Sequence, residues 1–255
     1  MTELKALVFD CDGVLAETEK DGHRVSFNRA FKEEGLQVEW GLEEYGELLE
    51  VAGGKERMKF YFTNLDKKDI SDEFITKLHR TKTTIFMEMC NKGELPIRPG
   101  IKRLIQEARD CGLMLSVCST SNYNSVVALM NAILGNQFFS YFEGNIFAGD
   151  IVNSKKPSPD IYNLMKTKLK LKGEECCVIE DNENGLLAAK GAGVNCIVTV
   201  SYYSVGEDFR NADLVVSSLG DPGTPKINIY KENASLGEEH ISFITLKHLK
   251  QIASG

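Results

Sequence analysis

The chain has 255 residues, and its 30 Lys and Arg against 37 Asp and Glu give a formal net charge of −7 at pH 7. A hydrophobic share of 42% is ordinary for a globular protein and excludes disorder as the main state. The acidic balance disfavours a nucleic-acid partner, because such a protein needs a broad basic face to neutralise phosphates. The length allows one large α/β domain or a core with an inserted subdomain.

Short β-rich apolar runs alternate with helical stretches, which is the pattern of a parallel sheet wound by helices. The expected strands are residues 4–9, 113–118, about 145–148, 176–179, 196–200 and 214–216, the last of them at the sheet edge. The expected helices are residues 101–110, a helix opened by Ser158-Pro159-Asp160, residues 185–190 and a last helix near 244–252. Residues 221 to about 239 are expected to be loose. The predicted fold class is α/β, a Rossmann-like parallel sheet core with helices on both faces.

An all-helical segment interrupts this pattern directly after the first strand. Its expected helices are residues 22–34, 42–52, 55–64 and 71–92. The chain returns to the sheet through a hinge from Pro96 to Gly100 that two prolines stiffen. Such an insert is placed at the carboxyl ends of the parallel strands, where ligands bind in open α/β sheets. We therefore expect a core domain of residues 1–18 and 96–255 and a helical cap domain of residues 19–95.

Cysteine usage and hydropathy bear on the compartment. The chain has 7 Cys, an odd number, and four of them lie in or beside apolar strand-like runs: Cys11, Cys118, Cys177 and Cys196. This favours buried reduced thiols over a disulfide framework. No apolar run approaches the roughly 18 to 20 residues that span a bilayer, and the N-terminus lacks the apolar core of a signal peptide. We expect a soluble monomer without a membrane partner, in the cytoplasm or the plastid stroma.

Acidic side chains follow two of the expected strands. Asp10 and Asp12 come directly after the first strand, and Gly13 permits a sharp turn. Residues two apart in extended chain point to the same side, so these carboxylates crowd one place. Glu180 and Asp181 end another strand and converge on the same sheet edge. Crowded carboxylates require a divalent metal or a shared proton, and hard oxygen ligands favour Mg²⁺. A solvated turn at Asp10–Gly13 and a helix cap at residues 180–181 are the alternatives.

Hydroxyl groups and a lysine complete the predicted site. Ser119, Thr120, Ser121 and Asn122 end a third strand, where hydroxyls and backbone N–H groups at a helix N-terminus can hold an anion. Simple helix capping is the alternative. Lys156 precedes a proline next to a helix start and can compensate phosphate charge, although a loop lysine is often merely solvated.

The order of these four signals, Asp-x-Asp, hydroxyl, lysine and Glu-Asp, resembles the haloacid dehalogenase superfamily over the whole chain. The helical insert resembles its C1-capped, phosphoglucomutase-like branch. The resemblance implies that Asp10 is the nucleophile and Asp12 the acid/base, and that Ser119 and Lys156 hold phosphate. It places Mg²⁺ on the acids, here Asp10, Asp12, Glu180 and Asp181. The implied reaction is two-step phosphoryl transfer through an aspartyl-phosphate, and the acid at Asp12 argues against a dehalogenase.

The helical insert carries a second set of cationic residues. The run from Gly53 to Arg57, GGKER, places two glycines and two cations at a helix start, where they can surround an anion. His79 and Lys82 share one face of the long helix, with Arg80 beside them. A plain helix connection and a solvated face are the alternatives. Together these residues predict a second anion site and hence a substrate with two phosphates.

GGKERM, ETEKDGHR and CSTSN resemble the CbbY-type branch of xylulose-1,5-bisphosphate phosphatases. This implies a small-molecule sugar phosphate as substrate. The implied substrate contacts are Glu17, Gly53, Gly54, Lys55, Glu56, Arg57, His79, Arg80, Lys82, Ser119, Thr120, Ser121, Asn122 and Lys156, with His23 as a further candidate. Asn182 stands where the branch usually has Ser, and Tyr123-Asn124 stands where Glu-Lys is common. These departures bear on rate or substrate preference.

Other functions remain open at this point. A β-phosphoglucomutase uses the same nucleophile and acid/base but returns the phosphoryl group to a bound sugar bisphosphate. A general sugar-monophosphate phosphatase would not need the second anion site. A non-catalytic phospholigand sensor is a further alternative, and the intact acid set argues against it because a binder does not need Asp12.

Overall fold

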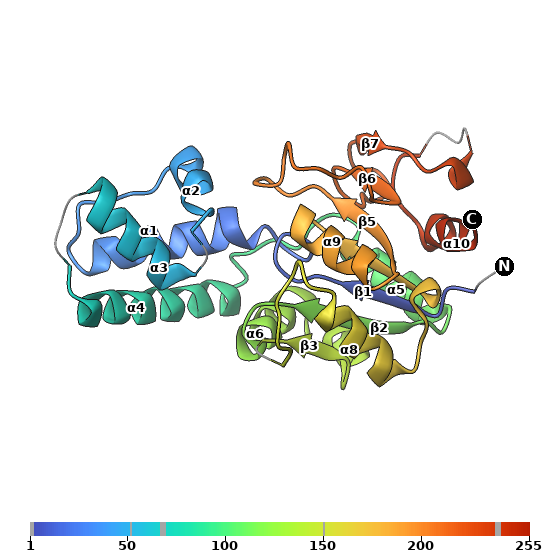
Figure 1. Ribbon diagram of the computed structural model, residues 1–255, viewed down its shortest axis with the longest axis horizontal. Helices are drawn as coiled ribbons and strands as arrows, with labels where there is room; N and C mark the ends of the chain where they lie inside the picture. Colours follow the sequence, from blue (N-terminus) through green and yellow to red (C-terminus); the bar gives the residue numbers. More distant parts are fainter. Residues whose placement is uncertain (1–2, 52, 67–69, 150, 238–240) are drawn as a thin grey trace. The chain divides into compact units, whose positions relative to one another are not determined.

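The computed structural model describes residues 3–51, 53–66, 70–149, 151–237 and 241–255 (Figure 1). The chain divides into two compact units. The larger consists of Met1–Glu17 and Pro96–Gly255, and the smaller is Thr18–Leu95. The assignment of the smaller unit as a cap domain stays a prediction. Among the described residues, no helix combines the length and the apolar character that a bilayer crossing requires.

The described residues of the larger unit form a seven-stranded sheet in the order β3-β2-β1-β4-β5-β6-β7. The strands are β1 (Ala6–Phe9), β2 (Met114–Ser119), β3 (Ile146–Ala148), β4 (Cys176–Glu180), β5 (Asn195–Thr199), β6 (Leu214–Val216) and β7 (Ile229–Lys231). Strands β1 to β6 are parallel, and β7 runs antiparallel to β6. The α/β fold class predicted from the sequence is confirmed.

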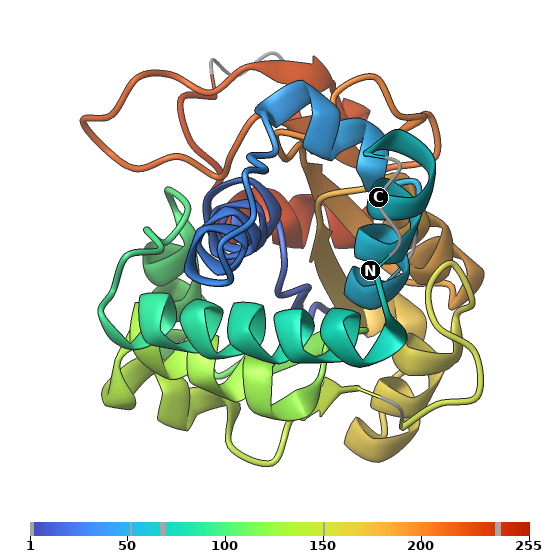
Figure 2. The same cartoon turned by 90° about the vertical axis from the view of Figure 1, so that its left-hand side faces the viewer.

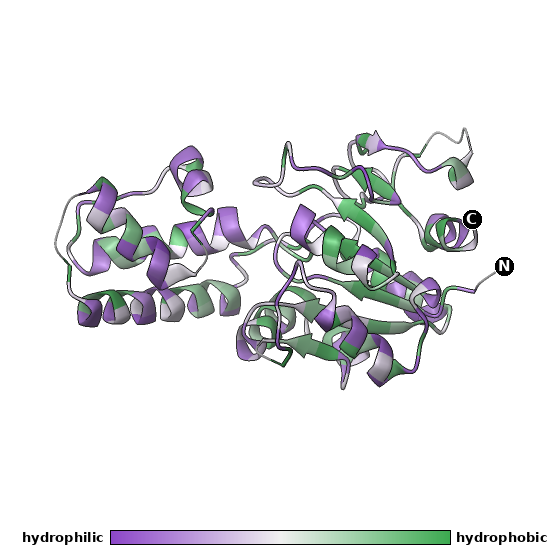
Figure 3. Cartoon of the chain, viewed as in Figure 1, coloured by the Kyte–Doolittle hydropathy of each residue, from purple (hydrophilic) through white to green (hydrophobic). Residues whose placement is uncertain are grey.

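Helices cover both faces of this sheet (Figure 1). They are α5 (Ile101–Asp110), α6 (Tyr123–Leu134), α7 (Asn136–Phe139), α8 (Asp160–Leu169), α9 (Glu183–Gly191) and α10 (Leu246–Ser254). Helices α8 and α9 lie on one face, and α5, which contacts α10, lies on the other. The central strands are mostly hydrophobic, as expected for strands buried on both faces, whereas α8 and α9 are mixed (Figure 3).

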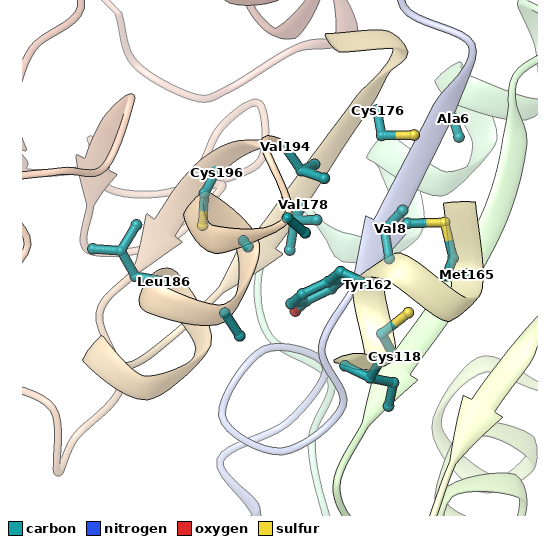
Figure 4. Close-up of a cluster of buried hydrophobic side chains, with 14 of the residues drawn as sticks. Ala6, Val8, Cys118, Tyr162, Met165, Cys176, Val178, Leu186, Val194 and Cys196 are labelled. Carbon is teal, nitrogen blue, oxygen red and sulfur yellow. The ribbon is translucent and has the colours of Figure 1, made fainter. Parts of the chain in front are cut away.

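Side-chain alternation along the strands determines which residues meet α8 and α9. Alternate residues of β1 and β4, such as Val8 and Val178, form a buried cluster with Tyr162 and Met165 of α8 (Figure 4). Three cysteines of the sheet belong to the same cluster, Cys118, Cys176 and Cys196. They are buried free thiols, as is Cys177, and Cys11 is also buried. The expectation of buried cysteines is therefore confirmed.

Two expectations for the C-terminal part are wrong. Strand β6 is not the sheet edge, because β7 pairs with it on its outer side. Strand β7 and a 3₁₀ helix over Ala234–Leu236 also lie in the stretch that was expected to be loose. Residues 238 and 239 of that stretch lie outside the described residues. A three-residue, half-exposed strand has too weak a hydrophobic pattern to be recognised alone, and its pairing with β6 establishes it.

The smaller unit is helical in its described residues. It contains a π-helix over Thr18–His23, α1 (Arg24–Glu33), α2 (Leu42–Leu48), α3 (Gly54–Phe60), a π-helix over Tyr61–Leu65 and α4 (Asp72–Asn91). Helices α1 and α3 both pack against α4 (Figure 2). The predicted helix over 42–52 ends earlier, at Leu48, and Ala52 lies outside the described residues. Aromatic rings fill the core, where Phe27, Phe31 and Tyr45 surround Trp40.

Candidate active site

The strand order brings the ends of β1 and β4 together. Strands β2 and β3 lie on one side of β1, and β4 and β5 lie on the other, so the strand order reverses direction between β1 and β4. Open α/β sheets bind ligands at such a switch point. Phe9 is paired with Ile179, so Asp10 and Glu180 follow at the same level of the sheet. The Asp10 backbone N–H donates to the Ile179 carbonyl at 2.9 Å. The predicted convergence of these acids is therefore present.

Three carboxylates form one buried group at this point. Asp10, Glu180 and Asp181 each offer an oxygen, and the three oxygens lie within 4.8 Å of one another. The Glu180 Oε2 atom is buried and has no hydrogen-bond partner among the described residues. Burial raises the pKa of Asp10 to about 8 and that of Asp181 well above its usual value, and the neighbouring carboxylates add to both shifts. An all-oxygen donor set with excess negative charge fits a divalent cation such as Mg²⁺.

Asp12 does not belong to this group of three. Its Oδ2 atom accepts a hydrogen bond from the Ser121 hydroxyl at 2.5 Å. The place of Asp12 among the metal ligands thus stays a prediction. The following residue, Gly13, has φ +78°, and a Cβ atom there would lie 2.1 Å from Asp181 Oδ2. Only glycine allows the chain to turn this closely past Asp181.

Lys156 joins two of the carboxylates. Its Nζ atom donates to Asp10 Oδ1 at 2.5 Å, to Glu180 Oε1 at 2.7 Å and to the Cys118 carbonyl at 2.9 Å. The side chain is 7% exposed. Burial by itself would lower the pKa of Lys156, but Asp10 and Glu180 outweigh it and raise the pKa, so the ammonium stays charged. The lysine that the sequence singled out is therefore a buried cation rather than a solvated one.

The hydroxyl-rich run after β2 lies beside Asp12. The Ser119 side chain is buried, and its Oγ accepts a hydrogen bond from the Ser121 backbone N–H at 3.1 Å. Asn122 caps α6, since its Oδ1 accepts from the Asn124 N–H at 2.9 Å. Capping, the simpler alternative, thus holds for Asn122. Thr120 is half-buried at the strand end, and the role of these residues toward an anion stays a prediction.

The departure at Asn182 is explained by two hydrogen bonds. Its Oδ1 atom accepts from the Gly185 N–H at 2.9 Å, which caps α9, and its Nδ2 donates to Asp181 Oδ1 at 2.8 Å. A serine at this position could cap the helix but would lack the amide N–H. Asn182 therefore both starts α9 and holds the Asp181 carboxylate.

Two residues with contacts to this site were missed from the sequence. The Tyr162 hydroxyl donates to Glu180 Oε1. The buried Arg98 guanidinium donates to the carbonyls of Gly13 and of the ends of β5 and β6: Gly13, Thr199, Val200 and Ser217. Arg98 Nε also lies 3.6 Å from Glu17 Oε1, while Glu17 Oε2 accepts from the Tyr202 N–H at 3.3 Å. Glu17, a predicted substrate contact, is therefore already paired within the larger unit.

Part of the second predicted anion set is assembled in the helical unit. A Cβ atom on Gly54 would lie 3.0 Å from His79 Nε2, so these residues are adjacent. The buried Lys82 Nζ lies 2.9 Å from His23 Nδ1 and over the rings of Phe27 and Phe86. Burial, and then the charge of Lys82, lowers the pKa of both histidines. His23 is thus neutral beside a cation.

Other members of that set lie elsewhere in the unit. The Arg57 guanidinium is buried and donates to the Leu48 carbonyl at 3.0 Å and to the Tyr45 hydroxyl at 2.9 Å. Arg80 is exposed and borders a surface depression with Asp72, Glu73, Thr76 and Lys77. Two residues apart on a helix do not share a face, so Arg80 does not accompany Lys82. Lys55 and Glu56 are exposed at the start of α3, and Gly53 has φ +92°.

The raised pKa of Asp10 leads to a prediction for cation binding. The folded pKa of about 8 exceeds the ordinary 3.8, so the metal-free protein holds a proton there and loses stability as the pH rises between these values. A cation must displace that proton. We therefore expect Mg²⁺ to raise the melting temperature of EDTA-treated protein more at about pH 8.5 than at about pH 6.5. Thermal unfolding at both pH values measures this, and an equal or smaller shift at the higher pH would contradict it.

The chain is similar to known hydrolases over most of its length. A model of the haloacid dehalogenase-like hydrolase family matches residues 4–193, the span that holds all the acids above. A CBBY-like protein of Arabidopsis thaliana is 46% identical over 244 residues, 93% of this chain and 76% of that protein. Protein CbbY of Cereibacter sphaeroides is 42% identical over 220 residues, 86% of this chain and 94% of that protein. A crystal structure of a CbbY mutant from Rhodobacter sphaeroides, in complex with xylulose-(1,5)bisphosphate, has a TM-score of 0.74 at 41% identity and covers 86% of this chain and 96% of that one.

Proposed function

The chain belongs to the haloacid dehalogenase-like hydrolase family and is a phosphatase, and on this basis we propose that it hydrolyses xylulose 1,5-bisphosphate with Mg²⁺ as cofactor. The observation that carries the proposal is the buried group of Asp10, Glu180 and Asp181 with Lys156 between two of them. The bisphosphate named for the R. sphaeroides CbbY mutant supports the substrate, because the match to that protein covers 86% of this chain at 41% identity.

In the proposed reaction Asp10 is the nucleophile. Lys156 holds its Oδ1 atom and keeps the carboxylate facing the sheet edge, while its ammonium compensates charge on the phosphoryl oxygens. Bound Mg²⁺, held by Asp10, Glu180 and Asp181, would supply further positive charge at those oxygens. Attack by Asp10 forms an aspartyl-phosphate and releases the sugar alkoxide.

Asp12 is the proposed acid/base. It protonates the leaving alkoxide and later removes a proton from the water that hydrolyses the aspartyl-phosphate. The Ser121 hydroxyl fixes its Oδ2 atom at 2.5 Å, and the turn that follows is anchored because Arg98 donates to the Gly13 carbonyl. Ser119 and the N–H groups around it are proposed to hold the phosphate. A rigid acid/base matters because proton transfer needs the reacting atoms within hydrogen-bond distance.

A bisphosphate needs two anion sites, and the second is proposed to lie in the helical unit. In the helical unit, the positive charge of Lys82 lies beside neutral His23. Gly54, at the start of α3 next to Lys55, is adjacent to His79 of α4. This set is proposed to hold the second phosphate. Arg57 is proposed to act indirectly, because its contacts with Leu48 and Tyr45 hold α3 in place.

A phosphate-release screen tests the function. Bisphosphorylated pentuloses and hexoses are compared with their monophosphates, with Mg²⁺ and with EDTA. We expect release from xylulose 1,5-bisphosphate that EDTA abolishes, and a preference for monophosphates would contradict the substrate. Incubation with β-glucose 1-phosphate and a bisphosphate primer separates a mutase, which would accumulate glucose 6-phosphate instead of free phosphate. No phosphate release from any ester would favour the sensor.

The second anion site has its own prediction. Lys55→Ala removes one exposed cation at the start of α3, and loss of a charged hydrogen bond of about 1.5 to 3 kcal/mol corresponds to a rise in KM of about tenfold or more. We expect this rise for xylulose 1,5-bisphosphate and no change for a sugar monophosphate. Lys59→Ala on the same helix, which pairs with Asp72, is the control and leaves both unchanged. Equal KM values for wild type and Lys55→Ala on the bisphosphate would favour a general monophosphate phosphatase.

The compartment and the oligomeric state of the protein are also proposed. Buried free thiols such as Cys118, Cys177 and Cys196 support a reducing compartment, the cytoplasm or the plastid stroma. A monomer is the proposed oligomeric state.

A further inference from the structure

One oxygen of Glu180 receives two hydrogen bonds. Its Oε1 atom accepts from Lys156 Nζ at 2.7 Å and from the Tyr162 hydroxyl, whereas Oε2 has no hydrogen-bond partner among the described residues. Both Glu180 and Tyr162 are fully buried, at 0% exposure. The carboxylate therefore has one oxygen saturated by protein donors and one available for another ligand.

The fold explains why Tyr162 reaches this carboxylate. Cys176 and Val178 lie on the face of the sheet that α8 covers, with Tyr162 in the first turn of α8 (Figure 4). By strand alternation Glu180 belongs to the same face. The ring centroid of Tyr162 is also 5.1 Å from Lys156 Nζ. Tyr162 thus contacts the site twice, with its hydroxyl on Glu180 and its ring near the ammonium.

The Tyr162 hydroxyl restricts the orientation of the Glu180 carboxylate, which the ring alone cannot do. With two donors on Oε1, the plane of the carboxylate is fixed. With Lys156 as its one protein donor, Glu180 could turn either oxygen toward the ammonium, and a cation would then compete with Lys156 for the same carboxylate.

We propose that Tyr162 is a positioning residue of the cation site, whose hydroxyl holds Glu180 so that Oε2 stays available to a divalent cation. The inference rests on the proposed function, because it takes Asp10, Glu180 and Asp181 as the cation site. Residues that orient metal ligands typically affect affinity or activity 10- to 100-fold.

The test uses three variants of the full chain. Tyr162→Phe removes the hydroxyl and keeps the ring near Lys156, and Tyr162→Leu removes both. Met165→Leu changes packing in the same buried cluster and on the same helix without touching a polar contact, and is the control. The binding of Mg²⁺ to EDTA-treated protein without substrate is measured by titration calorimetry. Values of kcat and KM are measured at saturating Mg²⁺.

We expect Tyr162→Phe to weaken Mg²⁺ binding about tenfold, with KM for the sugar phosphate unchanged and kcat restored to within about threefold by saturating Mg²⁺. Tyr162→Leu is expected to lower kcat further, and Met165→Leu to bind Mg²⁺ as the wild type does. A merely structural tyrosine would lower the melting temperature in Tyr162→Phe without changing the Mg²⁺ affinity.

A double-mutant cycle tests whether the Tyr162 hydroxyl acts on Mg²⁺ binding through Glu180. In Glu180→Gln the acceptor is neutral, so adding Tyr162→Phe should weaken Mg²⁺ binding no further. Additive losses, or wild-type Mg²⁺ affinity in Tyr162→Phe, would overturn the inference. If the wild-type protein binds Mg²⁺ and releases phosphate, and Tyr162→Phe has the same Mg²⁺ affinity, the inference fails and the proposed function remains intact. Wild-type protein that binds no Mg²⁺ would overturn both.

Discussion

Replacing Asp10 by Asn is expected to abolish turnover, with kcat falling by about four orders of magnitude or more. The amide has nearly the same shape as the carboxylate but is not a nucleophile, so no aspartyl-phosphate can form. Phosphate release from xylulose 1,5-bisphosphate at saturating Mg²⁺ measures the effect. Asp110→Asn, which changes an exposed aspartate at the end of α5, is the control and keeps full activity.

The same variant separates chemistry from folding. Asp10 shares a buried place with Glu180 and Asp181, and its pKa of about 8 shows that a negative charge there is unfavourable without a cation. Removing that charge should leave the melting temperature of the metal-free protein unchanged or higher at about pH 8.5, where the wild-type carboxyl loses its proton. Retention of even a few per cent of wild-type activity by a folded Asp10→Asn would overturn the assignment of the nucleophile.

Replacing Lys156 by Met is expected to impair both activity and stability. The ammonium is the cation between Asp10 and Glu180, with side-chain exposures of 7%, 9% and 0% for Lys156, Asp10 and Glu180. Removing one partner of a buried ion pair costs about 3 to 5 kcal/mol, because the other charge is left uncompensated. We expect a loss of that size in the free energy of unfolding of the metal-free protein. We also expect kcat/KM to fall about a thousandfold, since phosphate loses its lysine.

Lys190→Met is the matched control for this loss. Lys190 pairs with Asp213 at 2.7 Å, but both side chains are partly exposed, so the expected cost is below about 1 kcal/mol. Urea unfolding of both variants gives the comparison. Mg²⁺ should recover part of the stability of Lys156→Met, because a divalent cation can balance the same carboxylates. Equal destabilisation of the two variants would contradict a stabilising role for the buried pair.

Much of the candidate site could be predicted because its residues stand at the ends of strands. Asp10, Glu180 and Ser119 each follow an apolar run, and the carboxyl ends of parallel strands share one sheet edge. Their place at one sheet edge therefore needed no knowledge of the strand order, whereas the contact of Asp10 with Glu180 depends on the pairing of β1 with β4. Gly13 could also be predicted as a turn residue, because the turn after a strand is a local feature of the sequence.

The helical unit was predictable in its helices but less so in its contacts. The spacing of His79 and Lys82 on one helix face is a local property, and the two do lie near Gly54 and His23. The destination of Arg57 depends on α2, which supplies the Leu48 carbonyl and Tyr45 hydroxyl that its guanidinium contacts. No spacing within the run GGKER reveals that.

By itself, the sequence determined the α/β class, the helical insert, the acids and hydroxyl at the strand ends and the lysine next to a helix start, because periodicity and turn residues act over a few positions. The tertiary structure alone decided that Tyr162 meets Glu180, that Arg98 gathers the carbonyls of Gly13 and two strand ends, and that β7 pairs outside β6. Each of these contacts joins different elements of the fold. Which side chains meet there depends on the strand order, on the face each helix covers and on side-chain alternation along each strand.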